Sequence, residues 1–367
     1  MMLDDATNNR GMALVVTLGI IAVIAAAVLE YSRRTMDAAI ISKIMRDRIT
    51  ASHIAESGLN AAIALLAKDA KESETDTLNE DWAQSDVLEK LAKELSFEDA
   101  ELSIKITDER GKIQINALVN YPEGKLFSDS QKIVWDRMLR FFSSASGETD
   151  PDSDPTAIIE SLKDWLDYGD DDAISGLNGA ESPYYLNLSP PYPCANGPML
   201  NVDDIYAVKG IKKSLFEKFN LTESLKPYME KLPDDLIKPD ITSFLTVYGM
   251  TGTGGKDFTF DGKININTAS MPVLAAIAPS ENPDIAVSLY RFRSEFQEIS
   301  GKQRWWEELP GGKEIDSNLI TTHSDCFRIE AAAVVRGVVY RTEAVVRRNI
   351  ENTPGIPMIT VLSRTSS

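Results

Sequence analysis

The chain has 367 residues, which allows two or three modest domains in addition to a membrane segment. Its formal charge is −18, from 56 acidic and 38 basic side chains. This excess of negative charge argues against general attraction to nucleic-acid phosphates or anionic lipid and suits metal cations or basic partner surfaces better.

Residues 12–29 form an uncharged run of 18 residues, close to the length of a membrane-spanning helix. No small-residue cleavage site follows this run, which disfavours a cleaved secretion signal. Because no proline lies between Met12 and Lys68, we expect one unbroken helix of about 85 Å. Its apolar positions after the membrane recur at helical spacing and predict an amphipathic stalk over residues 31–70. Hydropathy alone favours a plain signal anchor.

The rest of the chain mixes strand and helix patterns. Residues 101–119 alternate in polarity like a hairpin with its turn at 108–111. Helical patterns follow, and residues 326–348 predict two long strands around Arg336 and Gly337. Strands far apart in the sequence therefore flank helices, which predicts an α+β fold interrupted by a helical insertion. Residues 351–367 are expected to be a tail.

Carboxylates are concentrated between Gly147 and Ser182, where 11 acidic residues accompany one basic residue. Calcium takes six to eight oxygen ligands, which a flexible acidic loop can supply. The candidate ligands are Asp167, Asp170, Asp171, Asp172 and Glu181. Asp164, three residues before Asp167 on a helix, either faces the same side or caps and salt-bridges locally.

The acidic loop is not a true EF-hand. Counted from Asp170, Asp172 and Glu181 take the third and twelfth ligand positions. However, Ile174 stands fifth and Ser175 replaces the tight-turn glycine, so the EF-hand pattern fails. A calcium loop and a solvated acidic loop remain the two interpretations.

The sequence contains few residues that indicate thiol or catalytic chemistry. Cys194 and Cys326 are too few for a metal knuckle, and a disulfide and two buried thiols are equally open. No set of nucleophile, base and orienting group is visible, and "GTGG" (252–255) lacks the Lys-Ser/Thr of a P-loop, so we expect no enzyme.

Two later segments, 201–219 and 264–293, look like helix-hairpin-helix units. The first contains "KGIKK", which fits phosphate binding, whereas the second has "APSENPD" where hairpin glycines belong. The acidic surroundings favour helix packing or protein docking for both. A membrane-tethered DNA-binding protein of an uptake system is the alternative function.

Five segments in order resemble the K-type minor pseudopilins of bacterial type II secretion: "RGMALVV", "ITDERGKIQINAL", "LKDWLDYGDDDAISGLNGAESPYYL", "CANGPMLNVDDIYAVKGI" and "KININTASMPVLAAIAP". The resemblance implies a pilin-like fold, in which a long N-terminal helix packs on a small antiparallel sheet interrupted by a large helical insertion with SAM-like helix-hairpin-helix units. The implied divisions are a leader (1–11), a membrane segment (12–30), the stalk (31–70), the first part of the sheet (100–127), the inserted domain (128–259), the second helix-hairpin-helix unit (260–310), the C-terminal strands (320–350) and the tail.

The resemblance also implies a function. Prepilin peptidase would cut after Gly11 and methylate Met12, leaving a single-pass inner-membrane protein with a periplasmic C-terminal domain. Position five of the mature chain, where pilin-like subunits generally carry a glutamate, is Val16. This absence suits a subunit at the pseudopilus tip, with pseudopilins of the I, J and H types as partners and no nucleic acid. The K-type family also implies structural calcium in the acidic helical region.

Overall fold

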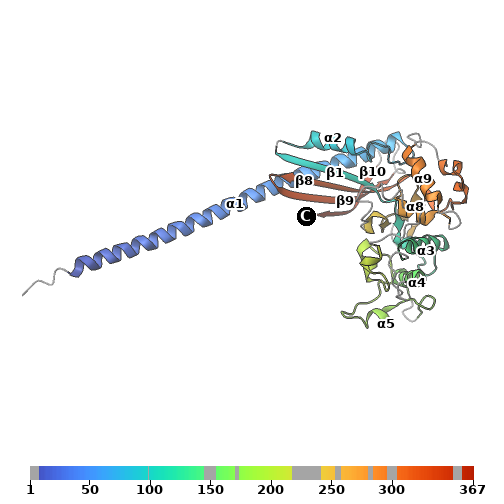
Figure 1. Cartoon of the computed structure of the whole chain (residues 1–367), viewed down its shortest axis with the longest axis horizontal. Coiled ribbons are helices and arrows are strands. Elements are labelled where there is room, and N and C mark those ends of the chain that lie inside the picture. Colours follow the sequence, from blue (N-terminus) through green and yellow to red (C-terminus); the bar gives the residue numbers. More distant parts are fainter. Residues whose placement is uncertain are drawn as a thin grey trace, which may run out of the picture.

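The computed structural model describes residues 8–97, 99–143, 154–169, 173–216, 241–252, 258–279, 284–295, 304–349 and 358–367. Its most conspicuous element is α1 (Asn8–Glu72), a continuous helix of 65 residues and roughly 100 Å. The expected unbroken helix is therefore confirmed. The N-terminal half of α1 projects away from the rest of the chain, and its C-terminal half lies along a sheet (Figure 1).

The sheet has four antiparallel strands: β1 (Ala100–Asp108), β8 (Cys326–Val335), β9 (Val338–Asn349) and β10 (Met358–Ser366), in the order β1-β8-β9-β10. The predicted strand pair around Arg336 and Gly337 is confirmed, because β8 and β9 pair from Val335 opposite Val338. A further helix, α2 (Ser85–Leu95), lies beside β1 (Figure 1).

Small residues let α1 approach the sheet closely. Ala51 and Ala55 of α1 pack against Ala333 and Val335 of β8. Farther along α1, Leu59, Ala62 and Leu66 join the buried residues of β8 and β9. A Cβ atom at Gly58 would lie 3.0 Å from Leu102 Cδ1, so a larger residue there would displace the β1 side chain.

The chain between β1 and β8 forms the insertion. Its helices are α3 (Asp129–Ser143), α4 (Pro155–Leu166), α5 (Ser182–Tyr185), α8 (Met271–Ile277) and α9 (Asp284–Glu295). Its 3₁₀ helices are η1 (Ile115–Leu118), η3 (Val202–Ala207), η4 (Lys213–Phe216), η5 (Ile241–Ser243), η7 (Trp305–Glu308) and η8 (Gly312–Glu314). Its strands are β2 (Ile113–Gln114), β3 (Leu245–Thr246), β4 (Met250–Gly252), β5 (Phe258–Phe260), β6 (Ile264–Asn265) and β7 (Ile320–Thr321).

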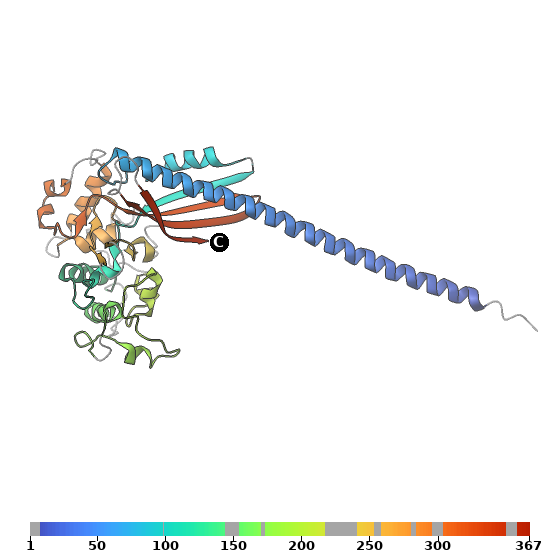
Figure 2. The same cartoon turned by 180° about the vertical axis from the view of Figure 1, so that it is seen from behind.

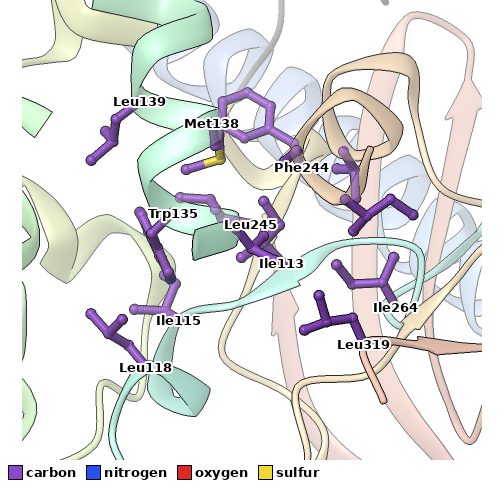
Figure 3. Packing of buried hydrophobic residues seen from close by; sticks show 14 of the residues in the cluster. Ile113, Ile115, Leu118, Trp135, Met138, Leu139, Phe244, Leu245, Ile264 and Leu319 are labelled. Carbon is purple, nitrogen blue, oxygen red and sulfur yellow. The ribbon is translucent and has the colours of Figure 1, made fainter. Parts of the chain in front are cut away.

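One hydrophobic core runs through the insertion. Trp135 of α3 and Ile113 of β2 are fully buried, and Figure 3 shows them among Phe244, Ile264 and Leu319. Residues from both sides of position 260 therefore share one core, although the sequence suggested a boundary there. Figure 2 shows the insertion at the end of the head opposite the projecting part of α1.

A buried polar network joins the insertion to the sheet. At the end of β1, Asp108 Oδ2 accepts hydrogen bonds from Ser324 Oγ (2.6 Å), Thr268 Oγ1 (2.6 Å) and Asn265 Nδ2 (3.0 Å). The backbone N–H of Ser324 donates to Asp76 just beyond α1 (2.6 Å). Because buried polar groups need partners, this network fixes where the insertion meets the sheet.

Three expectations about the sheet are wrong. The segment 101–119 is not a hairpin: β1 pairs with β8, and β2 pairs in parallel with β3. Only residues 100–108 of the expected 100–127 segment belong to the four-stranded sheet. The expected tail also contains β10, whose pairing with β9 shifts register at Val361 and Ser363.

Candidate functional site

Helix α4 places two of the candidate carboxylates. Asp154 caps the start of α4 by accepting a hydrogen bond from the backbone N–H of Thr156 (2.9 Å), and Asp167 follows the last helical residue. Since residues three apart on a helix share a side, Asp164 and Asp167 project in the same direction. The loop after α4 then brings Glu181, immediately before α5, to the same place.

These three carboxylates form a buried cluster that we call the acidic centre. Asp164, Asp167 and Glu181 are 0%, 6% and 2% exposed. Each offers an oxygen within 4.8 Å of the others, which is the spacing of ligands around one metal ion. Buried like charges at this distance repel strongly unless a cation or protons neutralise them.

Protein groups satisfy the acidic centre only in part. Both oxygens of Asp164 accept the backbone N–H of Ser175 (3.0 and 3.1 Å), and Lys163 Nζ lies 2.6 Å from Asp167 Oδ2. The buried Asp167 Oδ1 has no hydrogen-bond partner among the described residues. Burial raises the pKa of Asp164 and of Asp167, because one lysine does not compensate for the lost hydration.

Glycines make room for the carboxylate oxygens. A Cβ atom at Gly179 would lie 2.1 Å from Asp164 Oδ2, and one at Gly169 would lie 3.0 Å from Asp167 Oδ1. Any side chain at position 179 would therefore displace Asp164. These two glycines flank the acidic loop, and neither was recognised as part of the site from the sequence.

The structure places part of the predicted ligand set, and the role of these residues as ligands stays a prediction. It brings Asp167 and Glu181 together and adds Asp164, for which a local capping or ion-pairing role was the alternative. Asp170, Asp171 and Asp172 lie outside the described residues. The spacing of Asp164 and Asp167 on one helix was the available signal for the added ligand.

A second carboxylate group, at the C-terminal end of α1 and in the segment that follows it, was not predicted. Asp69, Asp76 and Glu80 also offer oxygens within 4.8 Å of one another. Here a protein cation is already present, since Arg348 of β9 donates to Asp69 Oδ2 (2.8 Å) and Asp76 Oδ1 (2.5 Å). This group is best described as an ion-pair network that ties α1 to the sheet.

Both cysteines are buried free thiols, so the structure favours the second of the two interpretations left open by the sequence. Cys194 Sγ donates a hydrogen bond to the Asp164 carbonyl (3.4 Å), while Cys326 begins β8. Burial raises the pKa of each thiol to about 12, which keeps both protonated near neutral pH.

The predicted processing and assembly residues lie on the projecting part of α1. Gly11, Met12 and Val16 are helical, and Met12 and Val16 are 62% and 55% exposed. Every residue from 11 to 46 is exposed. Within the described residues, α1 is the one helix long and apolar enough to cross a membrane. An exposed apolar surface of this extent is typical of a helix that a membrane or other helices cover.

The fold defines the class of protein. A long N-terminal apolar helix whose C-terminal half packs on an antiparallel sheet is the architecture expected of a pilin-like subunit, here enlarged by the insertion. The comparisons support the family resemblance: residues 111–229 match the family model described as type II secretion system (T2SS), protein K. The resemblance predicted from the motifs is therefore confirmed over this part of the chain.

Individual relatives agree with this match. Type II secretion system protein K of Klebsiella pneumoniae is 27% identical over 250 residues, covering 64% of this chain and 67% of that protein. Its Aeromonas hydrophila counterpart is 26% identical over 189 residues, covering 49% of this chain and 52% of that protein. The chain thus aligns with only about half to two thirds of these relatives.

A solved structure supports the fold. The crystal structure of the GspK-GspI-GspJ complex from the type 2 secretion system of enterotoxigenic Escherichia coli contains a chain similar to this one, with a TM-score of 0.56 and 14% sequence identity. The similarity covers 89% of this chain and 99% of that chain. This match extends over the sheet and the insertion together.

Proposed function

We propose that this protein is a minor pseudopilin that initiates or caps the periplasmic pseudopilus of a type II secretion system and has no enzymatic activity. The observation that carries the proposal is α1, whose exposed apolar half is continuous with a half that is packed on the sheet. Such a helix anchors the precursor in the inner membrane and later packs among other subunits. The head then faces the periplasm.

Two features support a position at the tip. Val16 provides no carboxylate to neutralise the N-terminal amine of a neighbour, and an unpaired charge is costly inside a membrane. The insertion occupies the end of the head opposite the projecting helix (Figure 1). A subunit stacked beyond that end would meet the insertion, so this chain fits best as the last one.

We propose I-type and J-type minor pseudopilins as the direct partners, with the H type next in the filament. The similar chain of known structure was crystallised as a GspK-GspI-GspJ complex. The apolar residues that α1 exposes between the membrane run and the head suit helical partners: Met36, Ile40, Ile41, Ile44, Met45 and Ile49.

We further propose that the acidic centre holds a structural calcium ion. Asp164, Asp167 and Glu181 would supply oxygen ligands, and the hard carboxylate oxygens fit calcium rather than a metal that prefers sulfur or nitrogen. The unpartnered Asp167 Oδ1 supports this assignment. Asp170, Asp171 and Asp172 remain proposed ligands, since they adjoin this loop in the sequence.

The helix-hairpin-helix units serve packing in this proposal. In the first unit, Gly210 makes the turn between η3 and η4 with φ of 84°. Its lysines lie against aromatic rings, with Lys209 Nζ 5.1 Å from the Tyr184 ring centre and Lys213 Nζ 5.4 Å from that of Tyr206. In the second unit, α8 and α9 contribute to the insertion core, and most of its hairpin lies outside the described residues.

The decisive experiment is mass spectrometry of the N-terminus after extraction from membranes that contain prepilin peptidase. The proposal predicts a chain that begins with methylated Met12. An intact N-terminus would indicate a plain anchor, and cleavage after the apolar run would indicate a secretion signal. The tip position is tested separately in reconstituted filaments, where labelled subunits spaced along the filament would contradict capping.

A further inference from the structure

A groove of about 950 Å³ lies where the end of β1 meets the insertion. Its walls come from the sheet, the segments before η3 and α8, and α9. Polar residues that line it include Asn201, Thr242, Ser243, Ser270 and Arg293. The size is that of a ligand pocket, and the proposed pseudopilin function assigns it no role.

Arg293 of α9, which lines this groove, is unusual among the buried cations of the described residues. It is 6% exposed, and no carboxylate lies within ion-pair distance among the described residues. Lys112 and Arg348, which are equally buried, lie 2.6 Å from Glu109 and 2.8 Å from Asp69. A buried cation without an anion is costly, so Arg293 requires an explanation that the other two do not.

Only part of the Arg293 guanidinium is used by the fold. Its Nη1 donates to the carbonyl oxygens of Ile266 (3.2 Å) and Ala269 (2.7 Å), and the group lies 5.4 Å from the Tyr290 ring centre. Within the described structure, Nε and Nη2 make no hydrogen bond. These two donors form the planar edge that binds a carboxylate through two parallel hydrogen bonds.

A second donor without a partner lines the same groove. The hydroxyl Oγ of Ser270 is buried, lines the same groove and has no hydrogen-bond partner among the described residues. Ser270 directly follows Ala269, whose carbonyl holds Arg293 Nη1. Buried hydroxyls are normally satisfied, so an oxygen ligand that bonds both groups would resolve two deficits together.

We propose that Arg293 and Ser270 form a binding site for a single carboxylate group. Of the other basic side chains that line the groove, Lys112 and Arg328 form ion pairs with Glu109. Arg293 therefore offers one positive charge without an ion pair, which matches a singly charged anion better than hydrogen phosphate. Burial also lowers the pKa of Arg293 to about 10, as expected of a cation that lacks its anion. The carboxylate comes either from a free small acid or from a protein partner, and the second source rests on the proposed function.

The site is tested with the full chain in detergent micelles. Sodium acetate, titrated against sodium chloride at constant ionic strength, should raise the melting temperature to a plateau, and phosphate should act at least tenfold more weakly. Arg293→Lys keeps a charge but loses the planar edge, so it should weaken the acetate response at least tenfold. Ser270→Ala should weaken it about threefold to tenfold. Arg291→Gln, on the exposed side of the same helix, is the matched control and should respond like the wild type.

A flat acetate titration of the folded wild type, or an equal response from Arg293→Lys, would overturn the site. Purified I-type and J-type pseudopilins then identify the source of the carboxylate. If a partner supplies it, acetate competes with complex formation and Arg293→Lys weakens the complex tenfold. If complex formation is unaffected while the acetate response persists, the ligand is a free acid. Methylation of Met12 tests the proposed function independently of both results.

Discussion

Removal of calcium is the sharpest test of the acidic centre. At 4.8 Å and an effective dielectric constant of about 20, each pair of unneutralised carboxylates repels by about 3 kcal/mol. Lys163 adjoins the group and offsets part of this repulsion. Protonation offsets more, in agreement with the raised pKa values of Asp164 and Asp167. A bound divalent cation would neutralise the carboxylates by direct coordination, and the protein would then depend less on Lys163 and on protonation.

The expected size of the stabilisation by calcium follows from mass action. Calcium at one hundred times its dissociation constant stabilises the folded state by about 2.7 kcal/mol. For a cooperative unit of about 150 to 250 residues, this corresponds to a rise in melting temperature of about 5 to 10 °C. The assay is thermal unfolding of the full chain in detergent, with calcium and then with excess chelator. Magnesium at the same concentration should have less effect, because it demands a tighter octahedral site.

Variants separate binding from general stability. Asp167→Asn and Glu181→Gln each remove a ligand charge, so each should abolish most of the calcium response while raising the stability of the metal-free protein. Glu123→Gln, an exposed acidic residue outside the centre, should leave the response unchanged. Equal melting temperatures of the wild type in calcium and in chelator would refute the metal assignment, since the acidic centre would then be stable without a cation.

Three further outcomes follow from the packing and charges. Arg348→Met should lower the free energy of unfolding in urea by about 3 to 5 kcal/mol, because two buried carboxylates lose their cation. The exposed control Arg341→Met should lower it by less than about 0.5 kcal/mol. Trp135→Ala should cost about 3 to 5 kcal/mol by the same measurement, and a loss below 1 kcal/mol would contradict its position in the insertion core. Burial raises the pKa of Glu80 from 4.5 to about 7, so the folded state binds the proton more tightly and the unfolding free energy should fall as pH rises from 4.5 to 7. Because burial also raises the pKa of Asp108, to about 6, Glu80→Gln should reduce this slope rather than abolish it, and an unchanged slope would refute the assignment.

Local patterns were sufficient for α1 and for the β8-β9 pair. A helix is closed by its own hydrogen bonds, and two strands joined by a two-residue turn are neighbours in sequence. β1 was recognisable as a strand, but alternation does not identify a strand's partner. The turn-like "DERG" suggested a hairpin, whereas Ala100 pairs with Val335 and the chain after the turn joins the insertion. β10 was missed because an irregularity between Val361 and Ser363 interrupts the alternation.

The acidic centre, like the sheet, could be predicted only in part. Composition located the stretch, and helical spacing placed Asp164 and Asp167 on one side. The approach of Glu181 depends on the loop between α4 and α5, where Gly179 accommodates the Asp164 carboxylate. No pattern in the sequence encodes that contact. The same holds for Arg293. The sequence does not show that this cation lacks an ion-pair partner, whereas the structure shows carbonyl oxygens as its hydrogen-bond acceptors.

The register of the sheet explains how so large an insertion is compatible with a pilin-like fold. Asp108, the last residue of β1, lies opposite Phe327 near the start of β8, so the chain leaves and re-enters the sheet at adjacent points. The insertion therefore leaves every strand pairing intact, and the network around Asp108 holds it at one end of the sheet. That end is the one opposite the projecting helix (Figure 2). An insertion at this site leaves the helix free to pack against other subunits, and its place at the far end of the head agrees with the proposed tip position.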